Sequence, residues 1–217
     1  MTASAETALL AAGAREIGVP LDADQLASLL RIVDELAAAN AQFNLTAIRD
    51  RPGMLRKHLL DSLTLVPYLQ AERIADVGTG GGFPGLPLAV ACPGRHFVLI
   101  EATGKKANFV ARTARRIGCA NVEIVHARAE NYHPSQPFAA VAARALSSLA
   151  EFVAHAGHLC TPNGRLLAMK GKRPDAEIAA LPKGFQVLAV HRLRVPGLDE
   201  ERHLVEICRA RPRPSEP

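Results

Sequence analysis

The residues with the clearest capacity for chemistry are one carboxylate, Asp76, and the glycines that follow it. Residues 73–85 read Arg-Ile-Ala-Asp-Val-Gly-Thr-Gly-Gly-Gly-Phe-Pro-Gly. The apolar residues around Asp76 are typical of a parallel strand buried on both faces. Gly78 and Gly80 allow positive φ and leave room for a ligand against the backbone. We therefore expect a nucleotide-type pocket here, with Asp76 supplying a negative charge for a cationic group of the ligand.

Three classes of ligand could use such a turn. A phosphate-binding P-loop needs Gly-Lys-Ser/Thr after its glycines, and none follows. Gly80, Gly82 and Gly85 have the G-x-G-x-x-G spacing of dinucleotide sites, but the first glycine of that motif should follow the strand directly. Counted from Gly78, the sixth position is Phe83. S-adenosylmethionine has no phosphate and carries an ammonium and a sulfonium, so an acid at the strand end suits it. We predict this methyl donor, with a nicotinamide-dependent oxidoreductase as the alternative.

Other polar residues follow the next expected strands. Glu101 stands about twenty residues after the turn, where an acid can accept both hydroxyls of a ribose. Ala129 and Glu130 follow a third strand and would flank an adenine. Arg144 closes an apolar run and must be paired or face the crevice, because burying an unpaired charge is costly. Lys170 opens a basic run at the same edge.

Composition restricts the classes of protein that fit. The chain has 217 residues, 48% of them apolar and 22% charged, as expected for a globular protein of one domain with an appendage. A net charge of +5 favours a polyanionic partner. We expect no membrane segment, no export signal and a cytoplasmic location. The four cysteines are far apart in the sequence, so we expect free thiols and no metal site.

The hydrophobic pattern predicts helices over most of the first seventy residues, including one at roughly 52–67, followed by alternating strands and helices. The expected strands are 73–77, 96–101, 121–126, 138–143, 164–170, 185–195 and 203–209, and the expected helices are about 84–91, 104–117, 147–158 and 174–181. This is an α/β fold with a seven-stranded, mostly parallel sheet and a C-terminal antiparallel hairpin, the Rossmann-like layout of class I methyltransferases. We expect a helical extension at 1–70, a catalytic domain at 71–210 and a flexible tail at 211–217. Ligands of such sheets bind beyond the carboxyl ends of the strands.

Several segments carry a resemblance to a known family. They are Asn44-Leu45-Thr46, His58-Leu59-Leu60-Asp61-Ser62, the segment from Asp76 to Gly85 with its Phe-Pro-Gly ending, Arg144-Ala145, Lys170-Gly171 and Arg202-His203-Leu204-Val205. From about residue 20 to residue 208, the chain resembles the bacterial 16S ribosomal RNA guanine-N7 methyltransferase family, also called glucose-inhibited division protein B.

The resemblance implies the substrate and the site. The donor would contact Gly78, Phe83, the Ala129–Glu130 pair and Arg144, and the substrate would be one guanine in the decoding-region loop of 16S ribosomal RNA, free or in the small ribosomal subunit. Guanine N7 has a lone pair and no proton, so the reaction needs alignment rather than a general base. Arg144 and Lys170 would hold the RNA or the guanine O6. We expect a monomer, and a non-catalytic ribosome-binding factor is a further alternative.

Overall fold

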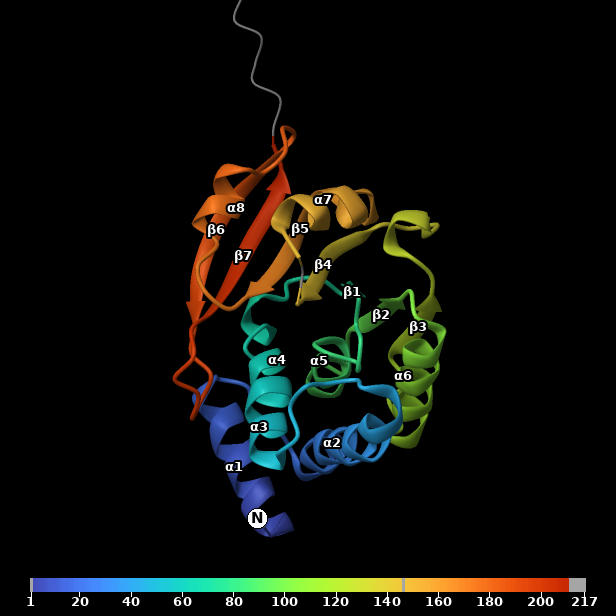
Figure 1. The fold of residues 1–217 in the computed structure, drawn as a ribbon, viewed down its shortest axis with the longest axis vertical. Coiled ribbons are helices and arrows are strands. Elements are labelled where there is room, and N and C mark those ends of the chain that lie inside the picture. Colours follow the sequence, from blue (N-terminus) through green and yellow to red (C-terminus); the bar gives the residue numbers. More distant parts are fainter. Residues whose placement is uncertain (1, 146, 211–217) are drawn as a thin grey trace, which may run out of the picture.

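The computed structural model describes residues 2–145 and 147–210, which form a seven-stranded sheet with helices on both faces (Figure 1). The strand order is β3-β2-β1-β4-β5-β7-β6. The strands are β1 (Arg73–Val77), β2 (His96–Glu101), β3 (Val122–His126), β4 (Phe138–Arg144), β5 (Cys160–Lys170), β6 (Phe185–Leu193) and β7 (Arg202–Arg209). β7 runs in the direction opposite to the other six strands, so it pairs antiparallel with both β5 and β6. The predicted fold class is confirmed.

Two hydrophobic cores cover the two faces of the sheet. In β1, Ile74 contributes to one core and Ala75 to the other, as expected for a strand buried on both sides. The first core packs the sheet against α1 (Ala3–Glu16), α2 (Ala23–Phe43), α5 (Gly85–Ala91) and α6 (Gly104–Arg116). The second packs it against α7 (Leu149–Ala156) and α8 (Asp175–Ala179). In the described residues, no helix is both long and apolar enough to cross a membrane.

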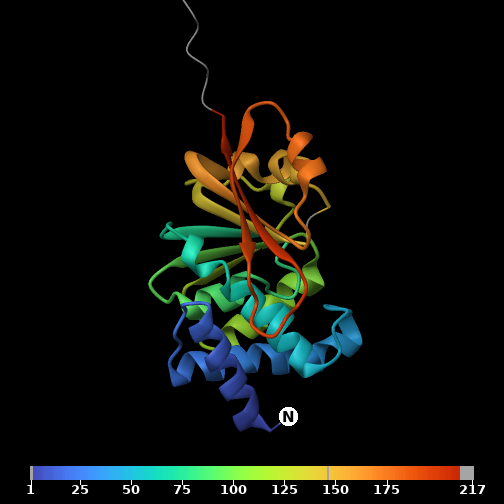
Figure 2. The same ribbon diagram turned by 90° about the vertical axis from the view of Figure 1, so that its left-hand side faces the viewer.

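The N-terminal helices have clear boundaries. Asp22 caps α2, because its carboxylate accepts a hydrogen bond from the Gln25 N–H at 2.8 Å and the Gln25 side chain bonds back to Asp22 N. Asn44 ends α2 in the left-handed conformation at φ 48°. Figure 2 shows these helices together at one end of the molecule, with the turn between β6 and β7 reaching down to them.

The single helix expected at 52–67 is interrupted. It consists of α3 (Arg51–Met54), a π-helical turn η1 (Leu55–Leu60) and α4 (Asp61–Leu63), and a 3₁₀ turn η2 (Val66–Tyr68) follows. A π turn adds a residue to the helical repeat, which hydrophobic spacing alone does not reveal. Such turns are frequent at functional sites.

Some other boundaries differ from the prediction. β5 begins at Cys160 rather than 164, because Cys160 pairs with Phe138 and the ladder then shifts register before Ala140. The Pro-Asn-Gly of residues 162–164 reads as a turn but lies within the strand. The expected helix 147–158 is α7 followed by a 3₁₀ turn, η4 (Gly157–Leu159). The expected tail, 211–217, lies outside the described residues.

The carboxyl ends of five parallel strands meet at one edge of the sheet. They end at Val77, Glu101, His126, Arg144 and Lys170. The chain order reverses between β1 and β4, since β2 and β3 lie on one side of this point and β5 on the other. Ligands bind at such a switch point in open α/β sheets.

Candidate active site

The glycine turn after β1 is held by Asp76. Its Oδ2 accepts hydrogen bonds from Thr79 Oγ1 at 2.7 Å and from the Gly85 N–H at 2.8 Å. Gly78, Gly80 and Gly82 have φ values of 69°, 58° and 94°, which glycine adopts readily. One oxygen of the predicted ligand-binding carboxylate therefore stabilises the turn.

The second oxygen of Asp76 is different. The side chain is buried, and Oδ1 has no hydrogen-bond partner among the described residues. Burial raises the pKa of Asp76 to about 6, and the bonds from Thr79 and Gly85 oppose that rise. A buried carboxylate oxygen without a partner is costly, so this atom can accept a donor from a ligand.

Glu101 connects the same turn to the start of α6. Its Oε2 accepts a bond from the Gly80 N–H at 2.9 Å, and its Oε1 accepts one from the Thr103 N–H at 2.8 Å. The side chain is buried. The predicted ribose acid therefore lies at the turn and orders the backbone on both sides of it.

A cavity of about 200 Å³ opens at the ends of β1 and β2. A Cβ built on Gly78 would meet no atom within 4 Å, so the end of β1 is open here. Gly78, Ala129 and Glu130, which the sequence predicted as ligand contacts, all line this cavity. Ala129 lies in a 3₁₀ turn, η3 (Ala129–Asn131), after β3. His155 also lines the cavity from α7.

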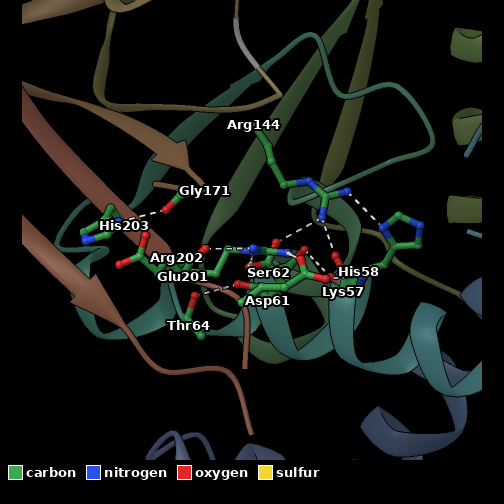
Figure 3. A network of polar contacts seen from close by, with 11 residues as sticks. Lys57, His58, Asp61, Ser62, Thr64, Arg144, Gly171, Glu201, Arg202 and His203 are labelled. Carbon is green, nitrogen blue, oxygen red and sulfur yellow. Dashed lines mark hydrogen bonds and ion pairs between the residues drawn. The ribbon is translucent and has the colours of Figure 1, made fainter. Parts of the chain in front are cut away.

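A second cavity, of about 560 Å³, lies at the ends of β4 and β5. Its walls come from the loop after α2, the η1–α4 segment and the start of β7. Four of its polar lining residues are lysine or arginine. The polar lining includes Thr46, Lys57, His58, Asp61, Arg144, Lys170 and Arg202. Figure 3 shows the network that joins several of these side chains.

Arg144 is the centre of this network. Its Nη1 donates to the Lys57 carbonyl oxygen at 2.8 Å and to Asp61 Oδ2 at 3.2 Å. The other oxygen of Asp61 accepts from Arg202 Nε at 3.2 Å (Figure 3). Burial raises the pKa of Asp61, and the two arginines oppose that rise. The sequence predicted that Arg144 is paired or faces the crevice, and it does both, because it pairs with Asp61 and lines the second cavity.

His58 fixes the other side of the Arg144 guanidinium. Arg144 Nη2 lies 3.1 Å from His58 Nδ1. Arginine can only donate, so Nδ1 accepts and the ring proton belongs on Nε2, which lies 2.8 Å from Thr46 Oγ1. Burial and the Arg144 charge lower the pKa of His58 to about 3, so the ring is neutral.

Phe83 joins the glycine turn to this network. Its ring stacks on His58, with the ring centroids 4.6 Å apart and the planes at 18°. The Arg144 Cζ lies 5.3 Å from the centroid of the same ring. The predicted contact residue Phe83 is thus buried between the two halves of the site.

Lys170 lines the second cavity but is not a free cation. Its Nζ lies 2.8 Å from Glu177 Oε2, and that oxygen also accepts the Leu149 N–H at 2.7 Å.

His203 of β7 donates from its Nδ1 to the Gly171 carbonyl oxygen at 2.8 Å and so holds β7 against the residue that follows β5. Among the described residues, no group of three or more histidine, cysteine, aspartate or glutamate side chains is arranged to hold a metal ion.

Sequence reasoning missed three features of the site. No sequence pattern indicated that Thr46 would contact His58, or that Glu177 would pair with Lys170. Asp61 was singled out as part of the segment from His58 to Ser62, and in the structure it is the shared acceptor for two arginines.

Comparisons with known proteins show what the whole chain is similar to. A family model described as "rRNA small subunit methyltransferase G" matches residues 25–205. Two relatives named "Ribosomal RNA small subunit methyltransferase G" come from Pseudomonas aeruginosa strain LESB58 and Xanthomonas campestris pv. campestris strain 8004. The first is 45% identical over 201 residues, covering 92% of this chain and 94% of the relative. The second is 48% identical over 187 residues, covering 86% and 88%.

Solved structures share the fold at low sequence identity. The glycopeptide N-methyltransferase MtfA, complexed with S-adenosylmethionine, has a TM-score of 0.60 at 12% identity, over 70% of this chain and 87% of that one. A methyltransferase from Aquifex aeolicus, described as SAM-dependent, has a TM-score of 0.57 at 18% identity, over 73% and 94%.

Proposed function

This chain belongs to the rRNA small subunit methyltransferase G family, and we propose that it methylates N7 of one guanine in the decoding-region loop of 16S ribosomal RNA. It is a methyltransferase that uses S-adenosylmethionine. We further propose that it acts as a monomer in the cytoplasm, on free 16S RNA or on the small ribosomal subunit. The nicotinamide alternative is not retained, because the matched family is one of methyltransferases.

The cavity beside Gly78 suits the donor. Its walls near Ala129 and Phe152 are apolar and would take a flat adenine, with Glu130 at the edge. Glu101 keeps a second lone pair on each oxygen, so it can accept ribose hydroxyls without losing its bonds to Gly80 and Thr103. The partnerless Asp76 Oδ1 fits the ammonium of the donor.

The larger cavity suits the guanine. Guanine presents O6 and N7 as acceptors on one edge. Arg144 uses both Nη1 hydrogens and one Nη2 hydrogen in the network, which leaves its Nε and a second Nη2 hydrogen without a partner among the described residues. These donors can bond to O6 and leave N7 free. Lys170 stands at the same wall, with its charge held by Glu177.

The chemistry then needs few protein groups. The donor supplies a methyl group on a sulfonium, and transfer forms the N7–methyl bond while the sulfur–methyl bond breaks and the sulfur keeps the electron pair. No proton moves at N7, so a general base is unnecessary. The guanine becomes positively charged, and Asp61 offsets the nearby charges of Arg144 and Arg202. The protein contributes alignment and electrostatics.

The observation that carries this proposal is the position of Arg144. It closes β4, next to β1 at the switch point, and lies against Phe83 of the glycine turn. An arginine with unused donors therefore lines a cavity large enough for a base and contacts the glycine turn, whose Gly78 lines the donor cavity.

The test is to incubate the protein with donor labelled in the methyl group and ribosomal RNA from a strain that lacks this activity. Free 16S RNA and intact small subunits should be compared, and the modified base mapped by chemical cleavage at N7-methylguanine. One labelled guanine is expected, and Arg144→Gln should reduce its labelling strongly. Absence of label on every RNA form would favour a non-catalytic ribosome-binding factor, and label at an atom other than N7 would contradict the proposal.

A further inference from the structure

Helix α6 carries an unusual set of charges. It contains Lys105, Lys106, Arg112, Arg115 and Arg116, and it has no acidic residue. Its buried side is apolar or small and packs on the sheet, with Ala107, Phe109, Val110, Thr113 and Ala114. The positive charges therefore gather on the opposite side, away from the core.

Three of these cations form a row. Lys105, Arg112 and Arg115 are exposed, and spacings of seven and three residues place them on one face of the helix. None of them makes an ion pair within the described residues, whereas Arg116 is bound by Glu35 at 2.6 Å. The row extends for about 15 Å along the helix, at about 1.5 Å per residue.

The row begins at the active edge of the sheet. Helix α6 starts at Gly104, three residues after Glu101, and Ala102 between them lines the donor cavity. Arg128, whose side chain is 71% exposed, lines the same cavity from the end of β3. From there α6 runs along the outer side of the molecule beside β2 and β3 (Figure 1).

We propose that Lys105, Arg112 and Arg115, the α6 cation row, bind the sugar-phosphate backbone of the RNA whose guanine enters the cavity at Arg144. This inference rests on the proposed function and adds a contact surface outside the two cavities. The aromatic residue of α6, Phe109, is buried, so the row has no ring on which a base could stack. It therefore contacts phosphates and positions the RNA, and it does not read sequence.

The experiment compares two triple variants that remove the same charge. The first is Lys105→Gln/Arg112→Gln/Arg115→Gln. The control is Arg15→Gln/Lys183→Gln/Arg194→Gln, three exposed cations on α1, before β6 and after β6. The affinity for a 16S RNA fragment is measured by fluorescence anisotropy at several salt concentrations, together with the affinity for the methyl donor and the KM and kcat of methylation.

The α6 triple should lose about tenfold or more in RNA affinity, and the slope of log affinity against log salt should fall by about 2 to 3, since each phosphate contact contributes about 0.7 to 0.9. Its KM for RNA should rise much more than its kcat falls, and donor affinity should stay unchanged. The control triple should behave like the unaltered protein. A third variant, Lys105→Arg/Arg112→Lys/Arg115→Lys, keeps the charge and should retain RNA affinity.

Three results would overturn the inference. Equal losses in both glutamine triples would assign the effect to net charge, and unchanged RNA affinity in the α6 triple would remove the contact. A loss in the charge-preserving variant as large as in the α6 triple would show that helix packing, not phosphate binding, is affected. Failure of the unaltered protein to bind or methylate RNA would instead refute the proposed function itself.

Discussion

Arg144 Nη1 lies 3.2 Å from Asp61 Oδ2, and this ion pair joins two residues that are 83 positions apart in the sequence. It connects the end of β4 to the first turn of α4. Both side chains are largely buried, with 19% and 5% of their surfaces exposed. Asp61 also holds Arg202 from the start of β7. One carboxylate therefore fixes three segments of the chain around the larger cavity.

Replacing Asp61 by asparagine should destabilise the protein and reduce methyl transfer. Removing one partner of a buried pair leaves an uncompensated charge and costs about 3 kcal/mol or more. Urea denaturation measures the free energy of unfolding. The control is Asp175→Asn, which breaks an exposed pair with Arg173 and should cost less than about 1 kcal/mol. Equal costs for the two variants would show that the Asp61 network adds no stability.

Long-range pairs of this kind were beyond sequence reasoning. The strands were predictable because each is a local apolar run with turn residues at its ends. The glycine turn was predictable for a similar reason, since its glycines directly follow such a run. The partners of Arg144 depend on where η1 and α4 lie against β4, which no local pattern specifies. The π turn was missed because it shifts the helical repeat by a residue. The early start of β5 was missed because pairing with Phe138 overrides the turn tendency of Pro-Asn-Gly.

Asp76 also had a role that its position in the sequence does not reveal. The acid at the end of β1 predicted a ligand contact, and the structure adds a bond network that orders the turn. The two roles use different oxygens. Variants at this position must therefore separate donor binding from folding.

Asp76→Asn should make this separation. An amide oxygen can keep the bonds from Thr79 and Gly85, while the amide NH₂ replaces the partnerless Oδ1 and cannot accept from an ammonium. The affinity for S-adenosylmethionine, measured by calorimetry, should fall by about tenfold or more, since charge-assisted bonds are the stronger ones. The variant should remain folded. Donor affinity equal to that of the unaltered protein would contradict the assignment.

The same carboxylate predicts a pH dependence. Because burial raises the pKa of Asp76 to about 6, protonation below that pH should weaken donor binding, by up to about tenfold per pH unit. Between pH 7 and 5 the affinity of the unaltered protein should fall, while that of Asp76→Asn should stay nearly flat.

The folded-state pKa of Asp76 lies above the ordinary value of 3.8, so the folded state binds more protons than the unfolded chain between pH 3.8 and about 6. Asp76 therefore lowers stability as the pH rises through about 6.

His58 predicts the opposite dependence for stability. Burial lowers its pKa from 6.5 to about 3, so the unfolded chain binds more protons between these values and acidification favours unfolding. From pH 7 to pH 5 this loss is about 2 kcal/mol. His58→Gln removes the titrating group. Between pH 7 and pH 5, the free energy of unfolding should therefore fall by about 2 kcal/mol more in the unaltered protein than in His58→Gln. A difference between the two proteins that stays constant from pH 7 to pH 5 would refute the burial argument.

The turn leaves no space for a side chain at Gly85, which lies against Asp76. A Cβ at this position would lie 2.7 Å from Asp76 Oδ2 and 2.6 Å from Leu99 Cγ, both in the buried interior. Gly85→Ala should therefore force the turn apart, costing about 1 to 3 kcal/mol and weakening donor binding with it. Gly94 is the matched control, because a Cβ there meets nothing within 4 Å and its φ is not positive. Gly94→Ala should change the melting temperature and the donor affinity very little. If Gly85→Ala kept full donor affinity, the close contact between Gly85 and Asp76 could not be what shapes the turn for its ligand.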